Sequence, residues 1–293
     1  MKQAVLLLAH GAPERIEDIP EYLTLVRGGR STAPEIVEEV KRRYAAMGGS
    51  SPLNARTREQ AEALQARLGI PVYTGMRNWR PPVIEAVKRM KADGIERAVA
   101  LPLAPHRSKA STGLYVRRAE EACREAGFSG ELVWTRSFFD HPLFIEALAE
   151  RLAQVLPAER VLFTAHSLPE RALDANDPYV HETRATASLV AARCGLPRMD
   201  FAYQSQSFTN EAWLGPAVED VLDGYAAEGV RDVALQPVGF VCDHLEILYD
   251  IDIAFRGYAR ERGIELRRPE SLNAYPTFIA ALAAIAEEAL CGA

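Results

Sequence analysis

Three patterns occur twice in this chain, each time in the same order. They are the Ala-His pair that ends an apolar run at His10 and at His166, the motif Trp-x-x-Pro-x-(Ile/Val)-Glu-x-Val that begins at Trp79 and at Trp213, and the related segments 94–106 and 229–244. Matches that keep one order along the chain indicate an internal duplication. We therefore expect two similar domains that face each other across a cleft, with the strand-end histidines of both halves looking into it.

Short apolar runs alternate with longer amphipathic segments throughout. The runs predicted as strands are residues 4–9, 72–75, 98–103, 132–135, 161–165, 201–204, 233–235 and 265–267. The segments predicted as helices are residues 34–47, 57–68, 81–92, 113–126, 142–155, 180–194, 216–227 and 275–290. This alternation is typical of βαβ units and parallel sheets. Right-handed crossovers then make each half a small, doubly wound, Rossmann-like α/β domain.

The length of 293 residues suits two such domains, because a typical domain has ~150 residues. Pro157 follows a helical pattern and precedes the strand that opens the second half, so it marks a boundary. We expect an N-terminal domain over residues 1–156 and a C-terminal domain over 157–293. The last helical segment can pack on either domain, including back on the first.

The charge balance argues against a nucleic-acid partner. The net charge is −6 and no Lys/Arg-rich run occurs, whereas phosphate binding needs a basic face. The apolar run 4–9 is too short for a signal-peptide core or a membrane span, and Glu287 and Glu288 interrupt the Ala-rich C-terminal segment. We expect a soluble, cytoplasmic protein without a transmembrane segment.

The cysteines give no sign of a metal centre. Cys123, Cys194, Cys242 and Cys291 are scattered, and no Cys-x-x-Cys pair occurs. This spacing suggests neither a zinc site nor an iron–sulfur cluster. We expect reduced thiols and no permanently bound cofactor.

Residues 237–252 gather acidic and imidazole groups where the strand 233–235 ends. From Asp243 onward, apolar residues recur at the helical positions 245, 248, 249 and 253, which predicts a helix with this stripe buried. One reading is purely structural: Asp243 is an N-cap and Glu246 the returning carboxylate of a capping box. The other is functional, because ligands bind at the carboxyl ends of strands in open α/β sheets.

Helical spacing sorts the polar groups of this segment. Glu246 and Asp250 are four residues apart and so stack on one face of the predicted helix. His244 and Glu246 are about 200° apart on an ideal helix, so they do not easily hold one metal ion together. A partner for Glu246 should therefore come from elsewhere in the chain.

His166 is the candidate partner, because it ends a predicted strand at the carboxyl edge of the second sheet. A hydrogen-bonded structural histidine is the plain alternative. A neutral imidazole and a carboxylate are suitable ligands for ferrous iron, and they also serve as base and acid in proton transfer. The pair of His166 and Glu246 is therefore a candidate for metal delivery coupled to proton removal.

Other polar and aromatic residues lie in or near Gly-rich loops or strand ends. Arginine forks and serine hydroxyls suit the carboxylate groups of a ligand, with exposed arginines paired to helix glutamates as the alternative. An aromatic ring can wall a flat apolar ligand. His10 is either an axial or substrate contact or a hydrogen-bonded turn histidine. The candidate binding residues are His10, Arg27, Arg43, Tyr44, Ser51 and Tyr115.

In these motifs the chain resembles the ferrochelatases, nearly from end to end. The matching segments are Ala165-His166-Ser167-Leu168-Pro169, residues 239–246 with Leu248-Tyr249-Asp250, Trp213-Leu214-Gly215-Pro216, Gly48-Gly49-x-Ser51-Pro52-Leu53 and Leu103-Ala104-Pro105-His106. The resemblance implies insertion of ferrous iron into a porphyrin held between two Rossmann-like domains. It also implies His166 and Glu246 as the metal-binding pair, Asp250 as the next acidic group, and Arg27, Arg43, Tyr44, Ser51 and Tyr115 as porphyrin contacts.

The segment between Arg30 and Gly48 is short and resembles that of coproporphyrin ferrochelatases, since relatives acting on protoporphyrin IX often carry a longer hydrophobic lip there. The four propionates of coproporphyrin III also suit the Arg/Ser/Tyr set. The alternatives are a protoporphyrin IX ferrochelatase, a sirohydrochlorin-type chelatase and a non-catalytic tetrapyrrole or haem carrier. The implied partners are the porphyrin and ferrous iron, and a monomer is compatible with the sequence.

The chain departs from the family pattern at two positions. His10 stands where compact relatives usually carry a tyrosine that can ligate the product iron. Ala254 stands where a third carboxylate often follows Asp250, so the outer metal site of the family lacks one of its acidic groups here. The cysteine-bearing extension of cluster-containing relatives is not found, which agrees with the cysteine spacing.

Overall fold

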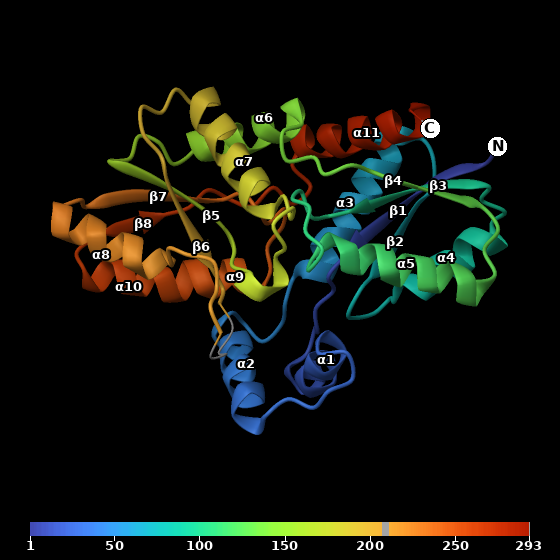
Figure 1. The fold of residues 1–293 in the computed structure, drawn as a ribbon, viewed down its shortest axis with the longest axis horizontal. Helices are drawn as coiled ribbons and strands as arrows, with labels where there is room; N and C mark the ends of the chain where they lie inside the picture. The colour runs from blue at the N-terminus through green and yellow to red at the C-terminus, as the bar shows by residue number, and fades with distance from the viewer. Residues whose placement is uncertain (207–210, 293) are drawn as a thin grey trace.

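The computed structural model describes residues 1–206 and 211–292, and this part of the chain forms two parallel sheets of four strands (Figure 1). The sheet orders are β2-β1-β3-β4 and β6-β5-β7-β8, so both halves share one strand order. The strands are β1 (Gln3–Ala9), β2 (Val72–Met76), β3 (Arg97–Pro102), β4 (Glu131–Trp134), β5 (Arg160–His166), β6 (Asp200–Gln204), β7 (Asp232–Pro237) and β8 (Glu265–Arg267). The predicted α/β class and all eight predicted strands are confirmed.

Helices cover both sheets and connect successive strands. They are η1 (Ile16–Asp18), α1 (Ile19–Val26), α2 (Pro34–Ala46), α3 (Leu53–Leu68), α4 (Val83–Ala92), α5 (Thr112–Ala126), α6 (Pro142–Ala153), η2 (Glu170–Ala172), α7 (Tyr179–Arg193), α8 (Val218–Glu228), α9 (Leu245–Leu248), the π-helix η3 (Asp250–Phe255), α10 (Arg256–Glu261) and α11 (Pro276–Cys291). None of the helices in the described ranges is long and apolar enough to cross a bilayer.

The central strand β1 shows why these runs form buried parallel strands. Residues 4–8 have no exposed surface, because helices cover both faces of a parallel sheet and successive positions must then be apolar. Leu7 pairs in register with Thr74 of β2 on one side and with Leu101 of β3 on the other. Full burial of one leucine side chain contributes about 1.5–3 kcal/mol, so this short strand anchors its sheet.

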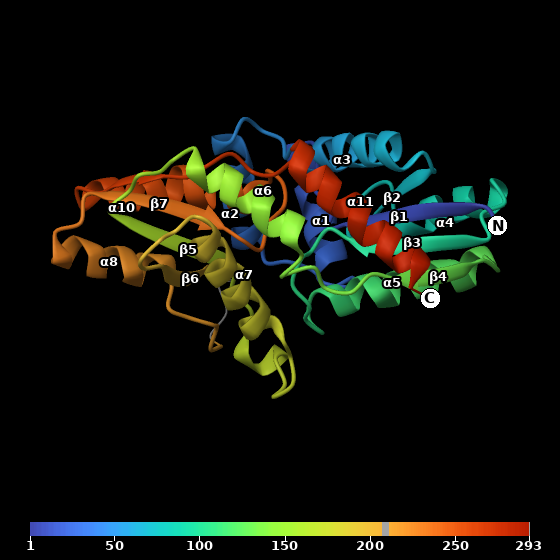
Figure 2. The ribbon, with the colours of Figure 1, turned by 90° about the horizontal axis from the view of Figure 1, so that it is seen from above.

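Two long helices join the halves. The C-terminal helix α11 packs against α3 and the first sheet, and it also packs against α6, which in turn contacts α7 of the second half. Figure 2 shows α6 and α11 lying side by side across the molecule. One apolar cluster contains Leu7 and Leu101 of the first sheet, Phe163 of the second, Phe144 of α6 and Phe278 of α11. The core is therefore continuous between the two sheets.

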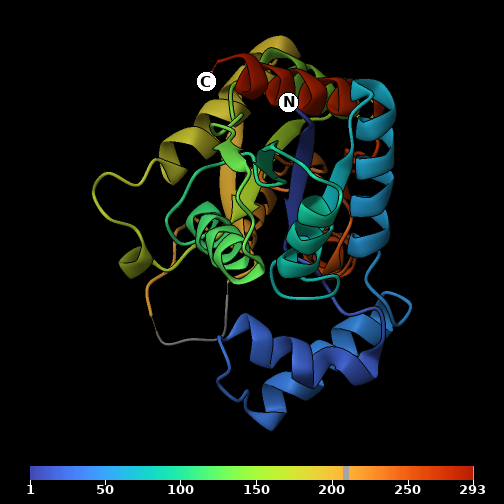
Figure 3. The same ribbon diagram turned by 90° about the vertical axis from the view of Figure 1, so that its right-hand side faces the viewer.

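The helices α1 and α2 project away from both sheets (Figures 1 and 3). The helix α1 is not among the predicted helices. Its one buried residue is Ile19, while Leu25 and Val26 are exposed. Its 8 residues are also fewer than the roughly ten that distinguish a helical pattern from a strand in a sequence.

The single helix predicted from Asp243 onward is wrong in detail. The chain forms four α-helical residues, α9, followed by the π-helix η3 and then α10. The buried apolar residues of α9 and η3 are Ile247, Ile251 and Phe255, whereas Ile253 of the predicted stripe is 40% exposed. A π-helical segment inserts an extra residue into the turn and rotates the residues after it, which a 3.6-residue period does not anticipate.

Candidate functional site

The site lies where the carboxyl ends of the central strands of the two sheets meet. In a sheet with the order 2-1-3-4, chain connections leave strands 1 and 3 in opposite directions, and ligands bind at this switch point. Here the loops after β1 and β3 and after β5 and β7 line one cavity of about 310 Å³. Its polar and aromatic lining includes His10, Tyr22, Tyr44, Ser51, Arg77, His106, Ser111, Tyr115, His166, Tyr179, His244 and Glu246.

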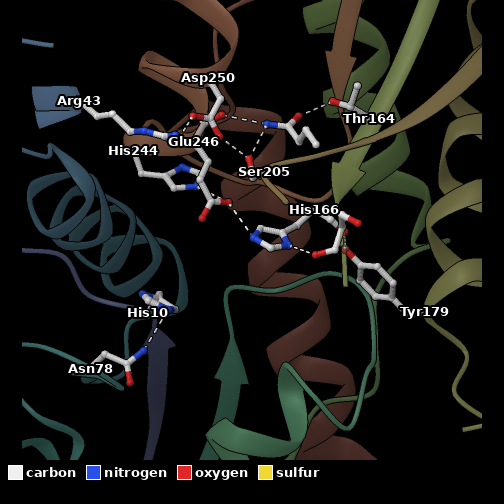
Figure 4. Close-up of polar contacts among 12 residues, drawn as sticks. His10, Arg43, Asn78, Thr164, His166, Tyr179, Ser205, His244, Glu246 and Asp250 are labelled. Carbon is white, nitrogen blue, oxygen red and sulfur yellow. Dashed lines mark hydrogen bonds and ion pairs between the residues drawn. The ribbon is translucent and has the colours of Figure 1, made fainter. Parts of the chain in front are cut away.

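His166 and Glu246 meet at this cavity. His166 ends β5, and its Nε2 atom lies 3.5 Å from Oε2 of Glu246 in the first turn of α9 (Figure 4). Nδ1 of His166 donates a hydrogen bond to the carbonyl of Ser167, and the hydroxyl of Tyr179 donates to the carbonyl of His166 at 2.7 Å. The bond at Nδ1 places the ring proton there and directs the lone pair of Nε2 toward Glu246.

His244 also reaches Glu246, which corrects the helical-wheel expectation. Its Nε2 atom lies 3.8 Å from Oε2 of Glu246. His244 precedes α9 in an extended conformation, with φ −162° and ψ −173°, so the angular separation of helical residues does not apply to it. Nδ1 of His244 donates to the carbonyl of Cys242 at 2.9 Å, which turns Nε2 toward the carboxylate.

The charges of this cluster are coupled. Burial raises the pKa of Glu246, but the imidazoles of His166 and His244 lower it more, and the net pKa lies well below the usual value. Burial lowers the pKa of His166, but the carboxylate of Glu246 and the hydrogen bond to Ser167 outweigh it, so the net pKa is raised. The pair therefore holds a carboxylate beside an imidazole that readily takes a proton.

The capping box that was the structural alternative for Asp243 and Glu246 is not formed. The backbone N–H of Asp243 donates to Oδ1 of Asn273 at 3.0 Å, and Oδ2 of Asp243 accepts from Nδ2 of Asn273 at 2.8 Å. The N-cap residue of α9 is His244, and it makes no side-chain capping bond. The carboxylate of Glu246 is consequently directed into the cavity and not back onto the helix start.

His10 lies on the opposite side of the cavity, at the end of β1 (Figure 4). Its Nδ1 atom donates to the carbonyl of Gly11 at 3.0 Å, and its Nε2 atom accepts from Nδ2 of Asn78 at 2.9 Å. Burial, aided by Arg77, lowers the pKa of His10 to about 3. His10 is therefore a neutral imidazole whose Nε2 lone pair is already occupied by an amide.

Gly11 allows this arrangement because the chain passes very close to the next strand connection. Its φ is +78°, and a Cβ atom built there would lie 2.8 Å from the Cβ atoms of Met76 and Trp79. The close approach lets the N–H of Asn78 donate to the carbonyl of His10 at 2.9 Å. Glycine is the residue that tolerates both the positive φ and the contact.

Asp250 lies next to this cluster but does not line the cavity. Oδ2 of Asp250 accepts from the hydroxyl of Ser205 at 2.5 Å, and Oδ1 lies 3.5 Å from Nη1 of Arg43 (Figure 4). Burial and the nearby Glu246 raise the pKa of Asp250 to about 6. The predicted stacking of Glu246 and Asp250 on one α-helical face is therefore wrong. Glu246 lines the cavity, whereas Asp250 contacts Arg43 of α2.

The predicted binding residues divide into two groups. His10, Tyr44, Ser51 and Tyr115 line the cavity, as His166 and Glu246 do. Arg27 is exposed at the C-cap of α1, outside the cavity lining, and Arg43 on α2 is tied to Glu39 and Asp250. The structure therefore gathers the histidine, tyrosine and serine candidates but leaves the two arginines outside.

The cationic residue of the cavity is Arg77, which the sequence reasoning missed. It follows β2 directly, its guanidinium lies 4.7 Å from the centroid of the Tyr115 ring, and its Nη1 atom donates to the carbonyl of Ser111 at 3.3 Å. Its buried Nε atom has no hydrogen-bond partner. The strand-end argument used for the histidines applies equally to Arg77 after β2 and to Ser205 after β6.

Gln204 is a second missed residue. It is 1% exposed at the end of β6, accepts from the hydroxyl of Thr164 at 2.7 Å and donates from Nε2 to the carbonyl of Glu246 at 2.9 Å. The second sheet thus holds the backbone of Glu246 directly. Within the described ranges, no group of three or more His, Cys, Asp or Glu residues is arranged to hold a metal ion.

Comparison with known proteins identifies the family. Residues 2–290 match the family model described as Ferrochelatase. A protein named Ferrochelatase from Acidobacterium capsulatum is 47% identical over 99% of this chain and 95% of its own length. One named Coproporphyrin III ferrochelatase from a Geobacillus species is 39% identical over 97% of this chain and 96% of its own length.

A solved structure described as SirB from Bacillus subtilis with Fe3+ is similar in fold, with a TM-score of 0.63 and 13% identity; the match covers 100% of this chain and 97% of that one. The match to the family model and the identity to named members both extend over nearly the whole chain. The chain therefore belongs to the ferrochelatases, the lyases that insert iron into a porphyrin in haem biosynthesis.

Proposed function

We propose that this ferrochelatase acts on coproporphyrin III, and that His166 and Glu246 carry the insertion of ferrous iron. The observation that carries the proposal is the 3.5 Å approach of His166 and Glu246 at a cavity whose opposite side holds neutral His10 and cationic Arg77. A metal-and-proton pair on one side and an uncharged imidazole on the other suit a flat macrocycle lying between them.

His166 is suited to both steps of metal insertion, which are binding of ferrous iron and removal of the pyrrole protons. With its proton on Nδ1, the imidazole offers the Nε2 lone pair either to ferrous iron or to a pyrrole proton. Glu246 balances the positive charge that arises on His166 when a proton is taken, because their atoms lie 3.5 Å apart. Iron is the substrate here, and two protein ligands leave its other coordination positions open to the pyrrole nitrogens.

Asp250 is the proposed next group for protons that leave the pair. Its pKa of about 6 lies between that of an ordinary carboxyl and neutral pH, so it can both accept and release a proton near physiological pH. Its partners Ser205 and Arg43 lie outside the cavity lining, so a proton taken by Asp250 is moved away from the porphyrin. Binding energy from the peripheral groups of the porphyrin would offset the strain of bending the macrocycle.

His10 is proposed as a contact to the macrocycle. In the arrangement seen here Asn78 donates to its Nε2 atom, so coordination of the product iron by His10 requires the amide of Asn78 to move. Contact through the ring edge requires no such change.

The preference for coproporphyrin III is supported by the polar groups of the cavity and by the short segment between Arg30 and Gly48. Arg77, Tyr44 and Ser51 can donate hydrogen bonds to propionates, and exposed Arg27 lies on the projecting α1. Coproporphyrin III has four propionates and protoporphyrin IX has two. A relative at 39% identity is named a coproporphyrin III ferrochelatase.

Anaerobic turnover with ferrous iron tests the proposal, with coproporphyrin III and protoporphyrin IX offered separately and loss of free-porphyrin absorption as the readout. We expect multiple turnovers with coproporphyrin III and a kcat/KM at least about tenfold higher than with protoporphyrin IX, which corresponds to about 1.4 kcal/mol of discrimination. A preference for protoporphyrin IX would contradict the substrate. Stoichiometric binding without metallation would point to a tetrapyrrole carrier.

The Arg77→Met variant sharpens this test because it removes the cation and keeps most of the side-chain volume. We expect its KM for coproporphyrin III to rise about tenfold, the value of one charge-assisted hydrogen bond, with a smaller change for protoporphyrin IX. Arg118→Met on α5 is the matched control, since Arg118 is exposed and does not line the cavity. Equal effects of Arg77→Met on both porphyrins would contradict binding by Arg77 of a propionate that protoporphyrin IX lacks.

A further inference from the structure

Behind His166 and Glu246, Asn273 binds two residues, Val241 and Asp243, of the loop that leads from β7 to Glu246. Its backbone N–H donates to the carbonyl of Val241 at 3.0 Å. Its Oδ1 atom accepts from the N–H of Asp243 at 3.0 Å, and its Nδ2 atom donates to Oδ2 of Asp243 at 2.8 Å. Residues 241–243 are therefore fixed from one side by a single asparagine.

A residue of the first half reinforces this contact. Gln60 of α3 is completely buried, and its Nε2 atom donates both to the carbonyl of Val241 at 3.2 Å and to that of Asn273 at 3.0 Å. Nη2 of Arg268, whose side chain is 10% exposed, lies 3.6 Å from Oδ1 of Asp243. The segment 241–243 is thus held by groups from both halves of the molecule.

The segment 241–243 orients the side chains of His244 and Glu246, which follow it in the sequence. The carbonyl of Cys242 accepts the hydrogen bond that turns His244, and Nε2 of His244 then lies 3.8 Å from Glu246. Because His244 is extended and α9 starts immediately after it, a shift of residues 241–243 moves both side chains relative to His166. His166 itself is fixed separately, at the end of β5.

The backbone of Asn273 shows why its side chain is informative. Its φ is +43°, a conformation that glycine adopts freely and that asparagine tolerates better than most residues. Glycine alone would satisfy the backbone at this position. Only asparagine also supplies the acceptor and the donor that bind Asp243, so the side chain has a role beyond the turn.

We propose that Asn273 is a positioning residue for metal insertion, which holds residues 241–243 so that His244 and Glu246 meet His166 at the cavity. This inference rests on the roles proposed above for His166 and Glu246. Asn273 does not line the cavity, so it acts on the reaction through the loop and not by contact with the porphyrin.

The Asn273→Gly variant tests the inference, because it keeps the backbone conformation accessible and removes only the side chain. At saturating coproporphyrin III and ferrous iron we expect kcat to fall about tenfold or more, since small misplacements of reacting groups have effects of this size. We expect KM for the porphyrin to stay within about twofold, because Asn273 makes no contact at the cavity. A wild-type kcat in this variant would overturn the inference.

A matched control removes a polar contact from the same region without touching the loop. Glu270→Gln breaks the ion pair between Glu270 and Arg151 at 3.0 Å. Glu270 lines the same pocket as Asn273, but its ion-pair partner is Arg151 and not a residue of 241–243. We expect wild-type kcat and KM. A loss of kcat equal to that of Asn273→Gly would show that any change in this region slows the enzyme, and would overturn a specific role for Asn273.

A second readout needs no turnover and separates this inference from the proposed function. The ¹⁵N resonances of the histidine rings report which nitrogen carries the proton. In Asn273→Gly we expect the signals of His244 to shift toward a mixture of tautomers, because the bond to Cys242 is loosened, while those of His106, bonded to Thr186 at 2.9 Å, stay unchanged. Unchanged His244 signals would overturn the inference. This outcome does not depend on turnover, so it is distinct from a failure of the roles proposed for His166 and Glu246.

Discussion

Nε2 of His166 and Oε2 of Glu246 lie 3.5 Å apart, although one residue ends β5 and the other follows β7. These two strands are neighbours in the second sheet, so the parallel arrangement delivers both groups to the same edge. We expect His166→Ala to lower kcat by about 10²–10⁴ at saturating iron, the usual contribution of a positioned acid or base. Steady-state metallation of coproporphyrin III measures this.

The control for that substitution is His181→Ala, because His181 is exposed on α7 and does not line the cavity. Its turnover should equal that of the wild type. Normal turnover of His166→Ala at saturating iron would show that the reaction does not depend on this imidazole.

Asp250 should make folding stability depend on pH. Its pKa is about 6 in the folded protein, against an ordinary value of 3.8 for an aspartate, so between these values the folded state binds more protons than the unfolded state. The contribution of the protonated group to stability is therefore complete below about pH 4 and is lost as the pH rises through 6. Asn at this position does not titrate.

We therefore expect the free energy of unfolding of Asp250→Asn, relative to the wild type, to increase by about 2–3 kcal/mol between pH 4 and pH 7. Urea denaturation at several pH values measures it. Parallel stability curves for the two proteins would show that the carboxyl of Asp250 titrates normally.

Gln204 should matter for both stability and turnover. Replacing it with leucine leaves the buried carbonyl of Glu246 and the hydroxyl of Thr164 without their partner, which costs about 1–3 kcal/mol for each unsatisfied group. It also frees the backbone of Glu246, so we expect kcat to fall by about tenfold. Thermal unfolding and steady-state kinetics measure the two effects.

Thr183→Val separates the two effects of the Gln204 substitution. Thr183 is fully buried, and its hydroxyl donates to the carbonyl of Tyr179 within α7. This variant should lose stability but keep its kcat. If Gln204→Leu behaved in the same way, the bond to Glu246 would be structural only.

Gly11 should be far less tolerant of substitution than other glycines with positive φ. In Gly11→Ala the new Cβ atom meets the Cβ atoms of Met76 and Trp79 at 2.8 Å, whereas at Gly94, with φ +70°, a Cβ atom meets nothing within 4 Å. We expect Gly94→Ala to cost about 1 kcal/mol from its backbone conformation alone. Gly11→Ala should cost several times more, measured as a drop in the free energy of unfolding, and equal costs would show that the close contact is relieved without strain.

The fold could be predicted well because its signals are local and periodic. Strands such as β1 and β5 are short, mostly apolar runs, and strand-end histidines are visible as His10 and His166. The duplicated patterns correspond to two sheets with one strand order. What periodicity could not show is α1, which buries only Ile19, and the π-helix at Asp250, which breaks the 3.6-residue repeat on which the predicted face depended.

Site residues at strand ends could be predicted from the sequence. Site residues whose positions depend on the local backbone conformation could not. The pairing of His166 with Glu246 follows from two adjacent strand ends. The position of His244 depends on an extended residue just before a helix, and the partner of Asp243 is Asn273, thirty positions away. Neither contact leaves a local trace in the sequence. Arg77 directly follows β2 and Gln204 ends β6, so the strand-end rule that located the histidines covers these two residues as well.

The position of α11 has a consequence for synthesis of the chain. The helix that covers α3 and the first sheet is Pro276–Cys291, which is made after the strands of both sheets. While a ribosome is still adding the second half, at ~5–20 residues per second, the apolar surface around Leu64 and Leu101 lacks its cover. The apolar surface of the first sheet therefore stays uncovered until α11 has been made, and a nascent chain truncated before α11 leaves that surface open to chaperones or to aggregation.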